Sequence, residues 1–234
     1  MNDVFKIKDK DVVSIVGSGG KTTLMNYLAK EFSSKKVLVS TTTKIRVPSQ
    51  GFYDFIAFNK EEADAIKDIN NKGIYVLGSK IKDNKLESFD LGYMESITNN
   101  FDVVFLEADG SKEKFIKGWN ETEPVILDNT TITIGIINLE ILGKLVNEDN
   151  VHRVEQFMDL TRAKLNDAIG KEHLIAVVRG KKGLFKNSRG RRILLINGVK
   201  DHKTRKTANE IADVILKDHN MIDEVIIGNK EWKC

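Results

Sequence analysis

An apolar run that leads directly into a glycine-rich turn, and then into a helical pattern, constrains this chain more than any other feature. Residues 12–16 are four aliphatic residues and one serine, and the turn 17–20 follows at once. Apolar residues then recur at helical spacing up to Phe32, and residues 36–40 form a second apolar run. This order predicts a strand, a helix that opens at Lys21, and a second strand.

The same alternation continues along the chain. Apolar runs predict further strands near residues 55–58, 73–77, 102–106, 125–127, 131–137, 192–197 and 224–227. Helical spacing predicts helices near residues 61–69, 91–99 and 203–217, and it dominates the stretch 151–178. This alternation predicts an α/β protein with a mostly parallel, doubly wound sheet flanked by helices. The runs 125–127 and 131–137 follow a loop without helical spacing, so one pairing there is either antiparallel or reached by a short crossover.

Composition favours one folded domain. The 234 residues are 41% hydrophobic and include two prolines, and they contain no linker-like or repeated segment. We therefore expect a single domain over residues 1–234, with a helical subregion near residues 138–180. The formal net charge of +3 is too small to indicate a nucleic-acid partner.

The sole cysteine, Cys234, excludes an intrachain disulfide and a multi-cysteine metal site. Such cysteine usage fits a reducing compartment. The first ten residues interleave charges with single apolar residues, and no apolar stretch in the chain approaches about 20 residues. We therefore expect a cytoplasmic protein with no membrane partner.

The turn and the first helical residues have the chemistry of a phosphate-binding loop. A phosphate needs several converging backbone N–H groups, and glycine allows this because it adopts positive φ and carries no side chain. The helix N-terminus adds further amides and the positive end of its dipole. In such a loop Lys21 contacts the β- and γ-phosphates, Thr22 binds Mg²⁺, and Thr23 hydrogen-bonds near the α-phosphate. The predicted residues for ATP or GTP with Mg²⁺ are Gly17, Ser18, Gly19, Gly20, Lys21, Thr22 and Thr23.

Position 15 separates this loop from the full pattern G-x-x-x-x-G-K-[ST]. The full pattern would place glycine where the chain has Ile15, so the match is to the shorter form G-x-x-G-K-T-T. A plain strand-to-helix turn with a solvated lysine is the structural alternative. Such a turn does not need glycine, lysine and threonine in this order, and we therefore expect a sheet of the P-loop NTPase type.

Two carboxylates follow the predicted strand 102–106. Glu107 is the first residue past the apolar run, and Asp109 comes two positions later. Ligands of parallel sheets bind beyond the carboxyl ends of the strands. We expect Glu107 to bind Mg²⁺ with Thr22, and Asp109 to orient or activate the attacking water or hydroxyl. Lys21, Glu107 and Asp109 are thus the predicted catalytic residues, with a charged strand end in water as the alternative.

A threonine-rich turn follows the second predicted strand. The hydroxyls of Thr42 and Thr43 are candidates to hold magnesium-bound waters, and Lys44 is a candidate to add charge near the γ-phosphate. An ordinary polar turn is the alternative. Beyond the acidic pair, a flexible polar loop is the candidate substrate contact, with Ser111, Lys112 and Lys117.

These motifs together resemble the YqeC-type family of accessory proteins for selenium-dependent molybdenum hydroxylases. The matching stretches are residues 16–24, 39–45, 106–112, 123–126 and 151–153. The block E-A-D-G-S-K at 107–112, combined with the loop G-S-G-G-K-T-T, is far more specific than either alone. The resemblance implies a P-loop NTPase that helps to mature molybdenum hydroxylases. It implies the molybdenum cofactor, or its selenium-containing form, as a client, and a hydroxylase as a partner.

Three weaker signals leave alternatives open. Asn197 and Asp201 resemble the N-K-x-D element by which GTPases read guanine, but they are one residue too far apart and no lysine follows Asn197. His152 and Arg153, at the predicted start of a helix, either place a cation near phosphates or are structural. Residues 179–192 carry seven cations and three glycines, which is typical of a mobile basic loop. Such a loop clamps an anion, docks an acidic partner or is simply solvated.

The leading functional hypothesis is nucleotide hydrolysis coupled to cofactor insertion or protein maturation. One alternative is a small-molecule kinase that acts on a cofactor precursor, with Asp109 as the base. The short loop also occurs in Mur-type amide ligases, but those enzymes need further domains. Another alternative is a nucleotide-gated binding module that does not hydrolyse its ligand.

Overall fold

The computed structural model describes residues 2–218 and 221–228. Cys234, on which the disulfide and compartment predictions depend, lies outside the described residues. The chain divides into two compact units. The first comprises Met1–Ile15, Thr22–Gly110 and Val125–Ile132, and the second comprises Val16–Lys21, Ser111–Pro124 and Thr133–Cys234. The single domain expected over residues 1–234 stays a prediction.

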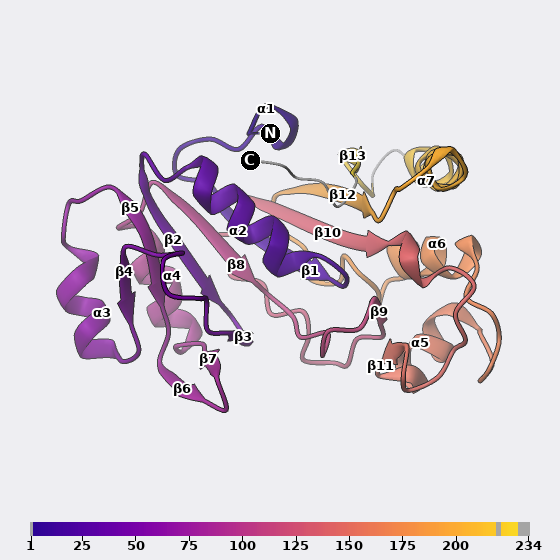
Figure 1. Cartoon of the computed structure of the whole chain (residues 1–234), viewed down its shortest axis with the longest axis horizontal. Helices are drawn as coiled ribbons and strands as arrows, with labels where there is room; N and C mark the ends of the chain where they lie inside the picture. The colour runs from indigo at the N-terminus through magenta and orange to yellow at the C-terminus, as the bar shows by residue number, and fades with distance from the viewer. Residues whose placement is uncertain (1, 219–220, 229–234) are drawn as a thin grey trace. The chain divides into compact units, whose positions relative to one another are not determined.

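Figure 1 labels the helices and strands in chain order. The helices are α1 (Asn2–Phe5), α2 (Lys21–Glu31), α3 (Lys60–Lys67), α4 (Leu91–Thr98), α5 (Val154–Thr161), α6 (Lys171–Arg179) and α7 (His202–Leu216), with a short 3₁₀ helix at Leu139–Ile141. The strands are β1 (Val12–Gly17), β2 (Lys36–Thr41), β3 (Lys44–Arg46), β4 (Phe55–Ala57), β5 (Gly73–Leu77), β6 (Lys80–Lys82), β7 (Lys85–Glu87), β8 (Val103–Glu107), β9 (Ile116–Lys117), β10 (Ile132–Asn138), β11 (Val151–His152), β12 (Arg191–Asn197) and β13 (Glu224–Ile227).

The first unit contains a parallel run of strands in the order β1-β8-β2-β5-β4. Glu107, the last residue of β8, lies opposite Ile15 of β1 and Thr41 of β2. Parallel neighbours end at the same edge of a sheet, so three strand ends meet around Glu107. The mostly parallel α/β fold predicted from the sequence is confirmed.

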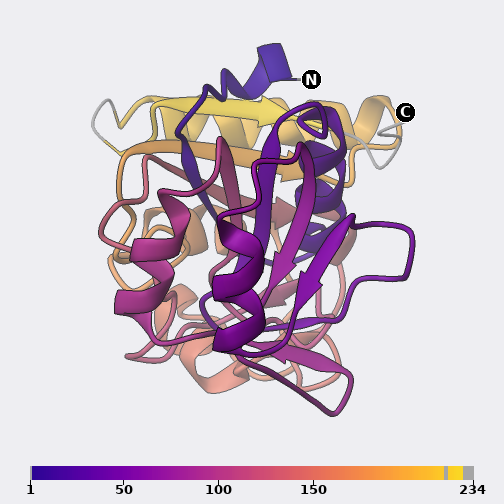
Figure 2. The same ribbon diagram turned by 90° about the vertical axis from the view of Figure 1, so that its left-hand side faces the viewer.

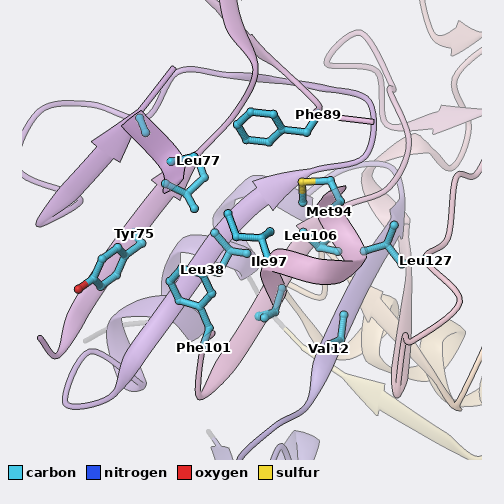
Figure 3. Close-up of a cluster of buried hydrophobic side chains, with 13 residues drawn as sticks. Val12, Leu38, Tyr75, Leu77, Phe89, Met94, Ile97, Phe101, Leu106 and Leu127 are labelled. Carbon is cyan, nitrogen blue, oxygen red and sulfur yellow. The ribbon is translucent and has the colours of Figure 1, made fainter. Parts of the chain in front are cut away.

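Both faces of these strands are covered by helices, as a doubly wound sheet requires. Leu106 of β8 belongs to a buried cluster that includes Met94 of α4 (Figure 3). The neighbouring Phe105 instead meets Phe32, just past α2, with 5.9 Å between the ring centroids. Figure 2 shows α2 and α4 on opposite sides of the strands. Because side chains alternate along a strand, this double cover explains why β8 is apolar at consecutive positions.

The second unit carries β10, β12 and β13 as neighbours, and β12 pairs with β13 in parallel. Helix α6 packs against both α5 and α7, and α7 also packs against β13. A separate two-stranded parallel sheet joins β9 to β11. Among the described residues of the chain, no helix is long and apolar enough to cross a membrane.

Several predicted elements need correction. Residues 125–127, which the structure describes, do not form the predicted strand. The Val125 N–H nevertheless donates a hydrogen bond to the Ala108 carbonyl. The stretch 151–178 begins with β11 and then contains α5 and α6 with an irregular segment between them. The small antiparallel sheet β3-β7-β6 was not predicted, because strands of three residues are too short to show a pattern of alternation.

Candidate functional site

The turn between β1 and α2 is built on glycines in a backbone conformation that other residues rarely adopt. The φ angles of Gly17, Gly19 and Gly20 are +98°, +75° and +140°. The Ser18 N–H donates to the Ile136 carbonyl of β10 at 3.2 Å. Helix α2 begins directly after the turn, and the amides of its first turn have no acceptor within the helix. This is the strand–turn–helix order that favours anion binding.

Two polar side chains of the turn are buried. Lys21 is 4% exposed, and its Nζ donates to the Gly17 carbonyl at 2.6 Å. Ser18 is also buried, and its Oγ has no hydrogen-bond partner among the residues that the structure describes. Buried hydroxyls without a partner are uncommon in folded proteins. An oxygen atom of a bound ligand would satisfy this one.

Two asparagines that the sequence did not assign to the turn hold it in place. Asn138 ends β10 and Asn197 ends β12, and the Nδ2 of each donates to the Gly19 carbonyl at 2.9 Å. Both asparagines stand at the carboxyl end of a buried strand, and this is the signal that could have found them.

Asn197 and Asp201, which resemble the N-K-x-D element, make contacts within the fold. The Asn197 amide contacts the glycine turn, as described above. Asp201 caps α7, where its Oδ1 accepts the Thr204 N–H at 2.7 Å. This hydrogen bond lowers the pKa of Asp201. The carboxylate is therefore engaged in helix capping, which is a structural role.

In the first unit the structure brings Thr22 and Glu107 together. Thr22 Oγ1 donates to Glu107 Oε2 at 3.0 Å. Glu107 is the last residue of β8, rather than the first residue past it, and is 8% exposed. Thr22 and Thr23 are exposed at the start of α2. The predicted metal ligands are thus a hydroxyl and a carboxylate in direct contact.

Thr41, the last residue of β2, and Thr42, which follows it, contact the backbone at the end of β8. Thr41 Oγ1 and the Thr42 N–H donate to the Glu107 carbonyl at 2.7 and 3.1 Å. Thr41 Oγ1 in turn accepts the Thr43 N–H at 2.9 Å. The Thr42 hydroxyl donates to the Val125 carbonyl at 2.6 Å. These bonds brace the end of β8, and nucleotide binding by Thr42 and Thr43 stays a prediction.

Asp109 and Lys44 occupy contrasting environments. Asp109 is fully buried, two residues past the end of β8. Lys44 is exposed in β3 and forms an ion pair with Glu87 of β7 at 2.8 Å. Hydrogen bonds from Lys44 and Lys80 lower the pKa of Glu87. The structure therefore gives Lys44 a role in the small antiparallel sheet, and its expected contact with a γ-phosphate stays a prediction.

Lys117, Glu123 and Arg153 form an ionic cluster in the second unit, in which Lys117 is buried and the other two are partly buried. Lys117 was expected in a flexible loop, but it lies in β9 with its side chain fully buried. Glu123 Oε2 accepts from Lys117 Nζ at 2.8 Å and from Arg153 at 2.5 Å, and Oε1 accepts a second Arg153 bond at 3.0 Å. Burial alone would raise the pKa of Glu123, but Arg153 and Lys117 outweigh it and lower the pKa to about 2.

His152 lies beside this ionic cluster. It belongs to β11 and pairs in register with Lys117, so it does not begin a helix as expected; α5 begins at Val154. Burial, followed by the charges of Arg153 and Lys117, lowers the pKa of His152 to about 4. The imidazole is therefore neutral near pH 7. Of His152 and Arg153, the charged residue is Arg153, and it is bonded to the Glu123 carboxylate.

The basic segment 179–192 is held by contacts, which corrects the expectation of a mobile loop. Leu184 is fully buried, and Lys186 Nζ donates to the carbonyls of Asn120 and Glu121 at 3.0 and 2.8 Å. Carboxylates of the same unit pair with further cations, in the pairs Arg179–Asp218, Lys182–Glu121, Arg191–Glu224 and Arg192–Asp223. Much of the positive charge in this segment is compensated within the fold.

The oxygen donors of Thr22 and Glu107 are of a kind that hard divalent cations such as Mg²⁺ accept. Within residues 2–218 and 221–228, no group of three or more His, Cys, Asp or Glu side chains is placed to hold a metal ion. Mg²⁺ does not need such a group, because it commonly binds through one or two protein oxygens together with water and substrate phosphates. The contact between Thr22 and Glu107 offers oxygen donors of this kind.

A parallel sheet flanked by helices defines the class of this chain as a doubly wound α/β protein, with a glycine-rich turn between β1 and α2 and an acid at the end of the adjacent strand β8. The chain belongs to the YqeC family, whose model, described as YqeC protein, matches residues 13–155. It is 32% identical over 186 residues to the uncharacterized protein YqeC of Escherichia coli (strain K12), covering 77% of this chain and 72% of that protein. No solved structure matches the chain.

Proposed function

We propose that this protein binds ATP or GTP with Mg²⁺ through residues 17–23 and hydrolyses it during the maturation of a molybdenum hydroxylase. The hydrogen bond between Thr22 and Glu107 carries the first part of the proposal. A hydroxyl at the start of a helix that follows a glycine-rich turn, in contact with an acid at a neighbouring strand end, is the arrangement that holds Mg²⁺ in P-loop NTPases. The family resemblance supports the second part.

Each residue of the site has a distinct task in this proposal. Lys21 and Thr22 are consecutive, so the ammonium group and the metal-binding hydroxyl can both serve one phosphate chain. Thr22 and Glu107 would hold Mg²⁺, which supplies positive charge to the phosphate oxygens when it is bound. The amides of the turn and of the first turn of α2 would hydrogen-bond the phosphates. Asp109 is the candidate to orient the attacking water.

Release of inorganic phosphate by the purified protein, with ATP or GTP and with or without Mg²⁺, tests the hydrolysis. Lys21→Ala should reduce turnover by at least about 100-fold, because a preorganised charge at the transferred phosphoryl group is lost. Lys30→Ala, at an exposed position in the last turn of the same helix, is the matched control and should leave turnover unchanged. Unchanged turnover in Lys21→Ala would sink the assignment. Tight binding without turnover would support the binding module instead.

The client needs a separate experiment. Native mass spectrometry of the protein purified from its own host would report the bound nucleotide, the metal and any cofactor together. A molybdenum cofactor or a molybdenum hydroxylase among the bound species would support the maturation role. A phosphorylated cofactor precursor formed at the expense of nucleotide would instead support the kinase alternative.

A further inference from the structure

The Gly19 carbonyl accepts hydrogen bonds from two side chains that come from different strands. Asn138 and Asn197 each donate Nδ2 to this oxygen at 2.9 Å, and they are 1% and 5% exposed. Buried amide–carbonyl bonds of this kind are costly to leave unmade. The carbonyl of a glycine-rich turn, which would otherwise have many orientations, is therefore held in one direction.

Each asparagine is itself oriented by a bond to its other amide atom. Asn138 Oδ1 accepts the Glu140 N–H at 2.9 Å, and Asn197 Oδ1 accepts the Gly198 N–H at 2.8 Å. With the oxygen committed to a backbone donor, the nitrogen of each amide is left to face Gly19. Both side chains are thus rigid supports for the turn.

The glycines of the turn make room for these supports. A Cβ atom at Gly19 would lie 2.6 Å from the Cβ of Asn138, and one at Gly20 would lie 2.6 Å from Nδ2 of Asn197. Neither separation is compatible with van der Waals contact between these atoms. Glycine is needed here for the close approach of two asparagines, in addition to the positive φ angles of the backbone.

Holding the Gly19 carbonyl also sets the direction of the next amide. In a planar trans peptide the C=O of one residue and the N–H of the following residue point to opposite sides. When the Gly19 oxygen points to the two asparagines, the Gly20 N–H points away from them. We propose that Asn138 and Asn197 are positioning residues that keep the Gly20 N–H directed toward the phosphate chain. This inference rests on the proposed function, because it takes a bound phosphate as the acceptor.

The test compares Asn138→Ala, Asn197→Ala and the double variant with the wild type. The control is Asn150→Ala in the same unit, which removes a bond from Nδ2 to the Leu145 carbonyl at 2.9 Å. Calorimetry would measure the Kd of the mono- and triphosphate of adenosine and guanosine in the presence of Mg²⁺. Each single variant should weaken triphosphate binding about fivefold, corresponding to one lost hydrogen bond. The double variant should lose more than the product of the single losses, because each single variant leaves one donor on the carbonyl.

The Asn138 and Asn197 variants should lose more affinity for the triphosphate than for the monophosphate. Asn150→Ala should bind both ligands like the wild type. Equal losses for both ligands, or a double variant that binds as tightly as Asn150→Ala, would overturn the inference while leaving the proposed function standing. Absence of nucleotide binding by the wild type would overturn both. If the alanine variants do not fold, Asn138→Ser and Asn197→Ser replace them, because a serine hydroxyl is too short to reach Gly19 but fills part of the space.

Discussion

The glycine turn and the Lys117–Glu123–Arg153 cluster are stabilised in opposite ways, although the turn, Glu123 and Arg153 all lie in motifs of the family resemblance. The turn is held by neutral amide groups that bond its carbonyl at Gly19. The cluster is held by ion pairs in which one carboxylate receives bonds from two cations. In the turn, two uncharged side-chain amides bond one backbone carbonyl. In the cluster, the charged groups satisfy one another.

This difference teaches that a motif can mark either binding or architecture. Arg153 and Glu123 are 30 positions apart in the sequence, and their bidentate contact gives a structural role to one residue of each of two matching stretches. Buried charges that are fully paired are weak candidates for catalysis, because a reacting group would have to break the pairing first. The contact between Thr22 and Glu107 joins a neutral hydroxyl to a carboxylate, and oxygen atoms of both kinds are ligands that Mg²⁺ accepts.

The largest expected effect is a loss of nucleotide turnover on substitution of Glu107, at the end of β8. Glu107→Gln keeps an acceptor for the Thr22 hydroxyl but removes the negative charge, so the fold should persist while nucleotide turnover falls about 1000-fold, a loss of several kcal/mol of metal-linked stabilisation. Phosphate release at increasing Mg²⁺ concentration checks this. Glu61→Gln, exposed in the first turn of α3, is the control. Full activity of Glu107→Gln would show that this acid is structural, like Glu123.

The next prediction concerns the ionic cluster of Lys117, Glu123 and Arg153. Arg153→Ala leaves Glu123 with one of its two cationic partners and should destabilise the protein by about 3 kcal/mol. Urea unfolding followed by circular dichroism measures this change. The variant should still bind nucleotide within about twofold of the wild type at temperatures where it is folded. Arg205→Ala, exposed on α7, should change neither property. A large loss of affinity in folded Arg153→Ala would bring the cluster into the binding site.

The smallest effect concerns pH. The pKa of Glu123 falls from 4.5 to about 2 on folding, and that of His152 falls from 6.5 to about 4. In both cases the folded chain holds fewer protons than the unfolded chain, so stability is full above the unfolded pKa and is lost on acidification. His152 should destabilise the fold between pH 6.5 and 4, and Glu123 between pH 4.5 and 2, by about 2 kcal/mol each.

Unfolding free energies measured across these pH values check the assignment. In His152→Gln the slope between pH 6.5 and 4.5 should flatten, because the group that titrates there is gone. The control is His202→Gln, at an exposed position at the start of α7, and it should keep the wild-type slope. An unchanged slope in His152→Gln would show that another group is responsible.

Local patterns predicted most of the fold. β13 has the predicted bounds, and β1, α2, β2, β8 and α7 differ from them by one or two residues. These elements are long or continuously apolar, so hydrophobic periodicity identifies them. The three-residue strands β3, β6 and β7 and the two-residue strands β9 and β11 could not be predicted. β3, β9 and β11 pair with strands distant in sequence, and β6 and β7 form a short hairpin. The pattern of each strand is too short to show alternation.

The candidate site was predictable in part for a similar reason. Lys21, Thr22 and the glycines are consecutive, and Glu107 ends an apolar run, so their chemistry is visible in the sequence. Asn138 and Asn197 reach Gly19 across sequence separations of 119 and 178 residues. The position of each asparagine at the end of a buried strand marks it as a candidate, but nothing local shows which turn its amide contacts.

The sequence by itself determined the parallel α/β class, the strand–turn–helix order and the residue types of the glycine-rich turn, because these depend on periodicity and on the backbone freedom of glycine. Only the tertiary structure decided which polar residues meet. In the folded chain Thr22 hydrogen-bonds Glu107, and two asparagines hydrogen-bond the Gly19 carbonyl. Lys117 and Arg153 both bond the Glu123 carboxylate. Such contacts depend on where distant strands end, and burial then requires each polar group to find a partner.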